Sequence, residues 1–408
     1  MKRFFAIMLS AMTMFSMFTA CGTPAQSDLP STSDTAEEQE APDAPAVEEA
    51  KWPTASETAD EMNLGINLGN TFEAYNADGC EKITYEWMPI VGNNTPYDYE
   101  TTWGATSPTQ ASIDGMKAAG FDTLRIPVYW GNMMENDGTW TIHPDYIARV
   151  KEVVDYCQKA DMYAVINIHH FDEFVIRRND IEECERIFDI LWTQIAEAFK
   201  NYDHRVVFEG FNEYLGGSQF DESGKLKDLP EFKGYALTNA CNQAFVDAVR
   251  ATGGNNAERV LIVSGYNTNI DRTTSDEFEM PKDTVANRLM VSVHYVDNNM
   301  YWSNSIGNQR WLDYIDDQCD KLERAFTSKG IPVFLGETTA SYPDDRMAKD
   351  AKYKKSANCV EIVLEELYDR GFIAAIWTCY DDWYDRTNCK MVDEDYAKVV
   401  SRIAKKER

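Results

Sequence analysis

Eight short, nearly continuous apolar runs recur along the chain after residue 59. Runs of this kind are typical of parallel strands that are buried on both faces of a sheet. They cover 62–68, 121–128, 162–168, 206–211, 260–264, 289–293, 331–335 and 372–377. Amphipathic stretches of helical period lie between them, the clearest at 181–199, 239–249, 311–326 and 360–368. This alternation predicts an α/β fold, a single (β/α)8 TIM barrel.

The longest insertion, 71–109, follows the first predicted strand and carries Trp87, Trp103 and several tyrosines. Loops that follow the strands of a barrel build its active face. We therefore expect this insertion to form a wall at one end of a cleft.

The N-terminus has the layout of a secretory signal, with two basic residues before an apolar run at 4–20. The run is too short and too polar for a stable membrane span. Phe18-Thr19-Ala20-Cys21 resembles a bacterial lipoprotein cleavage site, although leucine is usual where Phe18 stands. The alternative is an ordinary signal peptide in which Cys21 is a coincidence. We expect residues 1–21 to be a lipoprotein signal with an acylated Cys21, which places the protein outside the cell, on the cell surface.

A segment without core-forming residues follows the signal. Eight acidic side chains between residues 22 and 50 meet no basic side chain before Lys51. Low hydrophobicity with one sign of charge predicts a disordered, extended tether at 22–55. The rest of the chain, 56–408, is predicted to be the barrel domain.

The 408 residues carry a formal net charge of −29 at pH 7. A surface this acidic repels nucleic-acid phosphates and anionic lipid headgroups, so we expect no nucleic-acid partner and membrane contact only through the lipid anchor. The chain also has 10 Trp and 21 Tyr, more than a core alone usually needs. Composition therefore favours a body that binds a neutral or cationic ligand, and we expect it to be monomeric.

The cysteines after Cys21 are scattered through the predicted helices and strands. We expect most of them to be buried thiols. Cys379 and Cys389 are the closest pair in sequence and the best candidates for one disulfide. The chain has no CxxC pair, which excludes a zinc ribbon.

Polar side chains stand at or near the ends of most predicted strands, where a barrel carries its catalytic groups. In chain order they are Asn67, Asn70, Arg125, Asn167, His169, His170, Glu209, Asn212, Glu213, His294, Tyr295, Glu337 and Trp377. Each has an ordinary structural explanation: Arg125 can be a buried arginine paired with an acid, the histidines can belong to the core, and Trp377 can be packing. Their clustering is harder to explain as core filling, because buried charge is costly unless it is paired.

Two of these groups, Glu213 and Glu337, close the fourth and seventh strands. Two facing carboxyl groups fit hydrolysis of a glycosidic bond, in which one protonates the departing oxygen and the other attacks the anomeric carbon. Across a barrel mouth they should lie about 5 Å apart, the geometry of retaining enzymes. We expect one of them to stay protonated as the acid, and Arg125 to keep the nucleophile ionised.

The order of the motifs resembles glycoside hydrolase family 5, a family of retaining β-glycanases with (β/α)8 folds. The motifs are Gly65-Ile-Asn-Leu-Gly-Asn-Thr71, Arg125-Ile-Pro-Val128, Ile168-His-His170, Asn212-Glu213, His294, Gly336-Glu337 and Trp377. The resemblance covers about residues 60 to 385, and Glu-Thr-Thr-Trp-Gly at 100–104 looks most like the endoglucanase and xyloglucanase branch.

The resemblance implies a role for each residue. Glu213 would be the general acid/base, oriented by Asn212, which would also contact the sugar 2-hydroxyl. Glu337 would be the nucleophile, and Trp377 the platform under the −1 sugar. The supporting and substrate-binding residues would be Arg125, His169, His170, His294, Tyr295, Asn70 and Trp103.

The chain departs from the family pattern at three places. Tyr214 replaces the usual proline after Asn-Glu, and Thr338-Thr339 replaces the frequent Phe-Gly after the nucleophile. Val296 stands where a tyrosine commonly donates to the nucleophile, while the adjacent Tyr295 should face the other way on a regular strand. These departures leave the tuning of Glu337 and the preferred glycan open.

The sequence therefore predicts an endo-acting retaining β-1,4-glycanase that needs no cofactor or metal. Its substrate would be cellulose, mixed-linkage glucan or xyloglucan. The alternatives are a β-mannanase of the same family and a surface lipoprotein that binds glycan without catalysis, although a pure binder has no need of two acids. A metal-dependent hydrolase is disfavoured, because His169 and His170 are consecutive and their side chains should diverge.

Overall fold

A computed structural model describes most of the chain beyond residue 51. The described residues are 52–76, 89–135, 137–170, 180–213, 231–340, 356–379 and 383–406, with the backbone alone for 218–220, 226–228 and 356. The predicted signal, the tether up to residue 51, Cys21, Cys80, Trp87 and Tyr214 lie outside the described residues.

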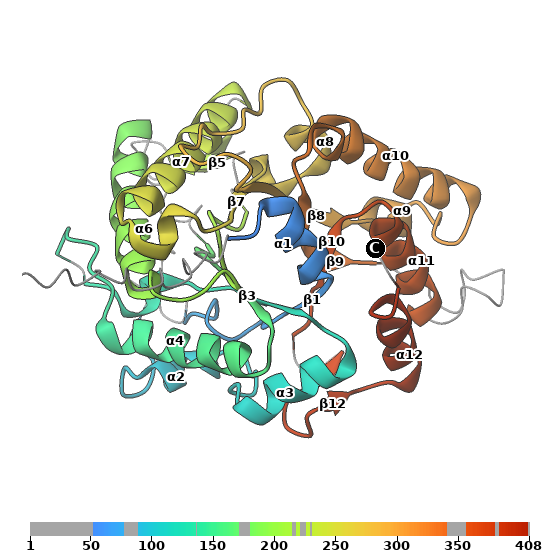
Figure 1. Cartoon of the computed structure of the whole chain (residues 1–408), viewed down its shortest axis with the longest axis horizontal. Helices are drawn as coiled ribbons and strands as arrows, with labels where there is room; N and C mark the ends of the chain where they lie inside the picture. The colour runs from blue at the N-terminus through green and yellow to red at the C-terminus, as the bar shows by residue number, and fades with distance from the viewer. Residues whose placement is uncertain are drawn as a thin grey trace, which may run out of the picture. The chain divides into compact units, whose positions relative to one another are not determined.

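Eight parallel strands close into a barrel in the order β1-β10-β9-β8-β7-β4-β3-β2, with helices around it (Figure 1). They are β1 (Leu64–Asn67), β2 (Thr123–Ile126), β3 (Tyr163–Asn167), β4 (Val206–Glu209), β7 (Leu261–Ser264), β8 (Leu289–Val296), β9 (Val333–Thr339) and β10 (Ile373–Ile376). Each overlaps one of the apolar runs, so the predicted (β/α)8 barrel is confirmed.

The amphipathic stretches are helical, as predicted. The longer helices are α3 (Gln110–Ala119), α4 (Pro144–Lys159), α6 (Ile181–Phe199), α7 (Glu231–Ala251), α10 (Gln309–Ala325), α11 (Ser356–Asp369) and α12 (Glu394–Ile403). Shorter elements are α2 (Pro96–Glu100), α8 (Ile270–Thr273), α9 (Asn298–Trp302), η1 (Trp130–Met133), η2 (Gly254–Ala257), η3 (Tyr266–Thr268), η4 (Thr327–Lys329) and the pairs β5 (Ser218–Phe220) with β6 (Leu226–Asp228) and β11 (Tyr384–Asp385) with β12 (Lys390–Met391). The Asp180 side chain caps α6 and the Asn308 side chain caps α10, which explains where these two helices begin.

A helix that the sequence analysis did not anticipate, α1 (Ala55–Met62), lies at the centre of the barrel in Figure 1. Thr54 begins it with a capping box, because its side chain accepts from the backbone of Glu57 and the Glu57 carboxylate accepts from the backbone of Thr54. The buried face of α1 packs in one cluster with side chains that point into the barrel. The helix therefore closes the N-terminal end of the barrel.

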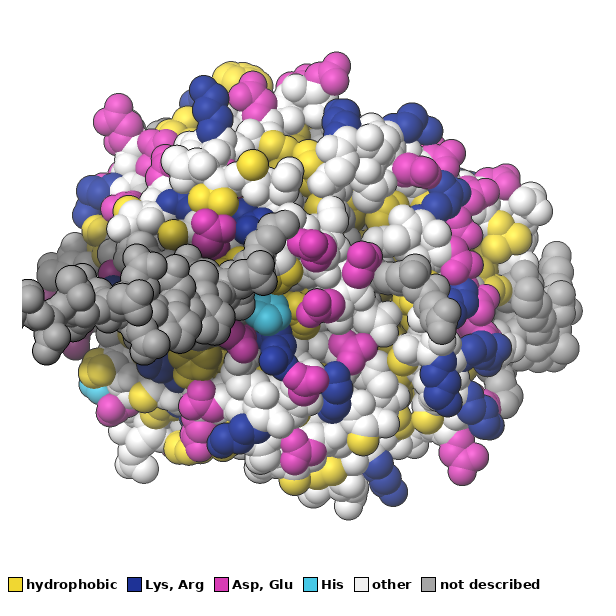
Figure 2. Space-filling view, viewed as in Figure 1, with side chains coloured by type: hydrophobic (Ala, Val, Ile, Leu, Met, Phe, Trp, Pro, Cys, Tyr) yellow, Lys and Arg dark blue, Asp and Glu magenta, His cyan; other side chains and the backbone are white. Residues whose placement is uncertain are grey.

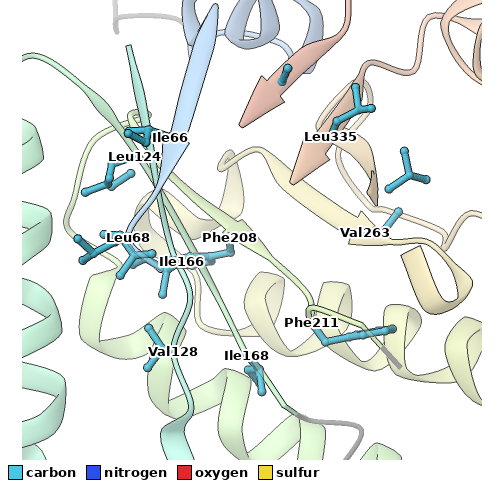
Figure 3. Close-up of a cluster of buried hydrophobic side chains, with 14 of the residues drawn as sticks. Ile66, Leu68, Leu124, Val128, Ile166, Ile168, Phe208, Phe211, Val263 and Leu335 are labelled. Carbon is cyan, nitrogen blue, oxygen red and sulfur yellow. The ribbon is translucent and has the colours of Figure 1, made fainter. Parts of the chain in front are cut away.

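Strand alternation divides the barrel side chains into two sets. One set, which includes Ile66 and Leu124 on adjacent strands, packs between the strands and the helices (Figure 3). The other set points into the barrel, and it is apolar next to α1, where Val165, Val207 and Met290 lie. Two positions further along the same three strands stand Asn167, Glu209 and Ser292. The barrel interior therefore changes from apolar to polar toward the carboxyl ends of the strands.

The cysteine prediction is partly right. Cys157, Cys184, Cys241, Cys319 and Cys359 are buried, as expected. The proposed disulfide is wrong, since Cys379 and Cys389 are both thiols and the Cys389 Sγ lies 3.6 Å from the carbonyl oxygen of Arg386.

The face seen in Figure 2 carries many acidic side chains, with lysines and arginines between them. Within the described part of the chain, no helix is long and apolar enough to span a membrane.

Candidate active site

Arg125 is fully buried in β2 and joins four other parts of the barrel. Its Nε donates to Glu209 Oε2 at 2.7 Å and its Nη2 to Asn212 Oδ1 at 2.7 Å. Its Nη1 donates to Asn67 Oδ1 at 3.0 Å and to Glu337 Oε1 at 3.1 Å. Both interpretations of Arg125 from the sequence therefore hold at once: it pairs with a buried acid, and it contacts the expected nucleophile.

Arg125 stays protonated although it is buried. Burial favours the neutral guanidine, but the negative charges of Glu209 and Glu337 outweigh this effect and raise the pKa of Arg125. A permanent positive charge therefore lies 3.1 Å from Glu337.

Glu337 enters the site from a β-bulge in β9. The pairing of β9 with β8 shifts by one residue between Val293 and His294, which leaves Gly336 as the extra residue. Bulges bend a strand and re-aim its side chains, and they are frequent next to active sites. The bulge brings Glu337 opposite His294, and its side chain reaches Arg125 inside the barrel.

Glu213 lies just beyond the end of β4 and faces Glu337 across the barrel mouth. One carboxylate oxygen from each, together with a ring nitrogen of His294, all lie within 4.8 Å of one another. The Nδ1 of His294 is 2.8 Å from Glu213 Oε1 and 3.8 Å from Glu337 Oε2. The Glu213 side chain is 44% exposed and that of Glu337 18%, so Glu213 is the one more open to solvent.

The surroundings of His294 favour its protonated form. Burial favours neutral His294, but the charge of Glu337 and the hydrogen bond with Glu213 outweigh it and raise the pKa of His294. Burial also favours neutral Glu213, yet the hydrogen bond and charge of His294 hold the pKa of Glu213 below its ordinary value. The expectation that one carboxyl group stays protonated as the acid remains a prediction, and the neighbouring His294 favours the ionised form of Glu213.

The same three groups, Glu213, His294 and Glu337, present enough donors to hold a divalent cation. The fixed charge of Arg125 beside Glu337 repels such an ion. The donor set therefore suits proton transfer and nucleophilic attack better than it suits a metal ion.

His169 and His170 do not diverge as expected. Their ring centroids are 4.6 Å apart with planes at 87°. The reason is that β3 ends at Asn167 and that His170 has a φ of 59°, in the left-handed region, so strand alternation no longer applies.

His169 is buried beside Trp377, and the two rings lie at 6.3 Å with their planes 17° apart. Burial holds the pKa of His169 well below its ordinary value, so the ring is neutral. Its Nδ1 finds no hydrogen-bond partner among the described residues. Trp377 is only partly buried, which leaves indole surface for a ligand.

His170 belongs to an aromatic wall. Its ring makes edge contacts with Tyr75, Tyr129 and Trp103 at centroid distances of 5.1, 5.8 and 6.0 Å. The indole N–H of Trp103 donates to the carbonyl of Tyr75 at 2.8 Å, which fixes its orientation. Burial lowers the pKa of His170 to about 4. Trp103 and Tyr75 both belong to the insertion after β1, so part of this insertion packs against His170. That the insertion forms a wall at one end of a cleft remains a prediction.

Tyr295 lies away from the carboxylate pair, whereas a substrate-binding role of Asn70 remains a prediction. Tyr295 is fully buried on the helix side of β8, and its hydroxyl points to Asp297 at 3.4 Å, so the structure does not bring it to the carboxylate pair. Asn70 is 7% exposed with a φ of 58°, and its backbone N–H donates to the carboxylate of Glu73. Asn70 therefore shapes the turn after β1.

The sequence assigned no role to two carboxylates that the structure shows to be buried. Glu73 is 1% exposed, and burial raises the pKa of Glu73 to about 7 despite the N–H groups that it accepts from. Glu209 is fully buried in β4 and pairs with Arg125. An acid inside an apolar run was the available signal for Glu209, because such a group requires a buried partner.

The family model for cellulases of glycosyl hydrolase family 5 matches residues 76–382. The chain belongs to this family. The family 5 match contains the site from Arg125 to Trp377, whereas β1 and the turn at Asn70 precede it.

Several proteins named as endoglucanases are similar to this chain. Endoglucanase A of Clostridium longisporum is 33% identical over 351 residues, which cover 84% of this chain and 62% of that protein. Endoglucanase A of Paenibacillus barcinonensis is 32% identical over 359 residues, which cover 78% of this chain and 83% of that protein. A xyloglucan-specific endo-β-1,4-glucanase of Bacteroides ovatus is 36% identical over 239 residues, covering 58% and 43%. The chain thus spans less than two thirds of the first and third of these relatives.

Solved family 5 structures agree with the fold. A lichenase from Caldicellulosiruptor sp. F32, in complex with cellotetraose, is 31% identical with a TM-score of 0.72, covering 88% of this chain and 97% of that one. A broad-specificity endoglucanase from Ruminococcus champanellensis, with bound cellotriose, is 28% identical with a TM-score of 0.69, covering 86% and 99%.

Proposed function

We propose that this chain is an endo-acting retaining β-1,4-glycanase that hydrolyses β-glucan-type polysaccharide. The observation that carries the proposal is the pair of Glu213 and Glu337, whose carboxylate oxygens approach within 4.8 Å. Retaining enzymes hold their two carboxyl groups about 5–5.5 Å apart, whereas inverting enzymes need about 6.5–9.5 Å to admit a water molecule between them. The separation therefore favours double displacement.

In the first step Glu337 is the nucleophile. Arg125 Nη1 donates to one of its oxygens at 3.1 Å and so holds the carboxylate in place. Attack on the anomeric carbon forms the ester bond to Glu337 as the glycosidic C–O bond breaks. Glu213, which is more exposed and lies just beyond the end of β4, protonates the departing oxygen.

His294 supplies the proton for that step. Its Nδ1 lies 2.8 Å from Glu213 Oε1, so the proton moves along one hydrogen bond when the leaving group demands it. Once Glu337 is an ester its negative charge is lost, and Glu213 then ionises more readily. In the second step Glu213 takes a proton from water, which attacks the intermediate and releases Glu337.

The substrate class follows from charge and aromatic surface. A chain with a net charge of −29 suits a neutral polysaccharide. The wall of Tyr75, Trp103 and His170 and the platform of Trp377 offer ring faces and edges to sugars. Relatives named as endoglucanases, a lichenase and a xyloglucan-specific glucanase support β-glucans as the substrate.

A reducing-end assay tests this function across carboxymethylcellulose, mixed-linkage glucan, xyloglucan and mannan, with product lengths resolved. Early products of mixed length from a β-glucan are the expected result. Activity on mannan alone would identify a β-mannanase, and binding without new reducing ends would identify a glycan-binding protein.

We also propose that Cys21 is acylated and anchors the enzyme to the cell surface as a monomer. Phe18-Thr19-Ala20-Cys21 supports the cleavage site, and the acidic segment after it supports a tether. A Cys21→Ser variant should be released into the medium with unchanged specific activity. Continued membrane association of that variant would contradict the anchor, and light scattering of the released protein measures its oligomeric state.

A further inference from the structure

We propose that Glu209 is a positioning residue for this reaction: it fixes the direction of the Arg125 guanidinium and so decides which N–H groups reach Glu337 and Asn212. The inference rests on the proposed function, because it assigns a part within the same site.

Glu209 is fully buried and both of its oxygens are occupied. Its Oε2 accepts from Arg125 Nε at 2.7 Å and from Asn167 Nδ2 at 3.1 Å. Its Oε1 accepts from the hydroxyl of Ser292 at 2.6 Å. Donors from β2, β3 and β8 therefore hold this carboxylate, and it cannot reach a substrate itself.

The planar guanidinium of Arg125 links the position of Glu209 to the positions of Glu337 and Asn212. Because its N–H groups form a rigid fork, a partner on Nε fixes where Nη1 and Nη2 point. In this orientation Nη1 meets Glu337 and Nη2 meets Asn212, the neighbour of the expected acid. Without Glu209, Arg125 could turn to bind Glu337 with two parallel N–H groups, the arrangement that arginine favours with a carboxylate. Such a turn would withdraw Nη2 from Asn212.

Glu209 also competes with Glu337 for the positive charge of Arg125. The charged groups that face Glu337 are Arg125 from β2, His294 from β8 and Glu213 beyond β4. With Glu209 present, the Arg125 guanidinium forms ion pairs with two carboxylates, Glu209 and Glu337. Loss of the Glu209 charge leaves more of the positive charge for Glu337, which stabilises its ionised form and makes it a weaker nucleophile.

The strand that bears the nucleophile packs directly on this ion pair. A Cβ at Gly336 would lie 3.0 Å from Glu209 Oε1, 3.1 Å from Arg125 Nε and 3.1 Å from Ser292 Oγ. The bulge that aims Glu337 thus rests against Glu209 and its partners, which couples the ion pair to the position of the nucleophile.

The test is Glu209→Gln, which keeps the shape of the side chain and removes its charge. We expect kcat on a soluble β-glucan to fall about 100-fold with little change in KM, the effect of a misplaced catalytic group. In this variant the acidic limb of the kcat/KM profile should move to lower pH. The reason is that Glu337 ionises more readily when Arg125 no longer pairs with a second carboxylate.

The matched control is Asp283→Asn, which breaks a similarly buried ion pair at the far end of α7. Asp283 accepts from Arg250 at 2.8 and 2.7 Å, and the two side chains are 5% and 7% exposed. This variant should lose thermal stability and keep the wild-type pH profile.

Ser292→Ala is the second variant and decides the matter if Glu209→Gln does not fold. It removes one donor to Glu209 and keeps the Glu209 charge, so kcat should fall less and the acidic limb should stay at the wild-type pH. Folded variants with wild-type kcat and pH profile would overturn the inference. If the wild-type enzyme cleaves β-glucan and Glu337→Ala does not, that result leaves the proposed function standing; a wild type without glycanase activity defeats the proposed function itself.

Discussion

The Nδ1 of His294 lies 2.8 Å from Glu213 Oε1 and 3.8 Å from Glu337 Oε2, so one buried imidazole faces both carboxylates of the pair. A positive charge on His294 favours the ionised form of Glu213, and the three groups lie within 4.8 Å of one another. In the proposed mechanism, the proton that the leaving group needs comes from His294, one hydrogen bond from Glu213.

This arrangement makes stability depend on pH. The folded-state pKa of His294 is raised above its ordinary value of 6.5, so its stabilising effect is complete below pH 6.5 and is lost as pH rises through the folded value. His294→Gln removes the effect. The loss in free energy of unfolding should be largest below pH 6.5 and shrink at alkaline pH, as measured by urea denaturation at a series of pH values. A loss that is constant with pH would contradict the charge state given to His294.

Trp377→Ala should damage catalysis far more than stability. The indole is partly exposed beside His169, so its removal takes the platform from the sugar and little from the core. We expect kcat/KM to fall about 100-fold with a small change in melting temperature. The contrast is Phe199→Ala at the end of α6, a fully buried ring whose loss should cost about 3–5 kcal/mol. A large drop in melting temperature for Trp377→Ala would show that Trp377 is packing.

Gly336→Ala tests the close approach at the bulge. The new methyl would press on Glu209 and Arg125 at 3.0 and 3.1 Å, and overpacking of this kind costs about 1–3 kcal/mol. The control is Gly65→Ala in β1, where the added Cβ would meet Ala375 at 3.1 Å without touching the ion pair. Both variants should lose stability, and only Gly336→Ala should lose kcat per folded molecule. Equal kcat values for the two variants would show that the close packing at the bulge does not affect catalysis.

The strands and the carboxylate pair could be predicted because their signals are local. An apolar run marks each strand of a buried parallel sheet, and Glu213 and Glu337 each stand two positions after the end of a run. The partner of Arg125 could not be named, because Glu209 is 84 positions away and only the closed barrel brings the two together.

Other features depend on backbone geometry that no residue pattern announces. The bulge at Gly336 appears only in the pairing of β9 with its neighbours. The left-handed φ of His170 brings its ring beside His169 where regular alternation predicts divergence. The hydrogen bond of Glu213 with His294, on another strand, likewise exists only in the closed barrel.

Chemical rescue tests how the two glutamates divide the work. Glu337→Ala should abolish turnover of every substrate, because no covalent intermediate can form. Glu213→Ala should still react with an activated aryl β-glycoside, whose leaving group needs no proton, and the intermediate should accumulate. Neither variant should cleave polysaccharide.

The most direct measurement is the configuration of the product that Glu213→Ala forms from the aryl glycoside in the presence of azide, read by NMR. Azide needs no general base, so it should restore turnover and give the β-glycosyl azide with retained configuration. Rescue of Glu337→Ala with an inverted azide would reverse the two roles, and near-normal polysaccharide hydrolysis by both variants would contradict a catalytic function for the pair.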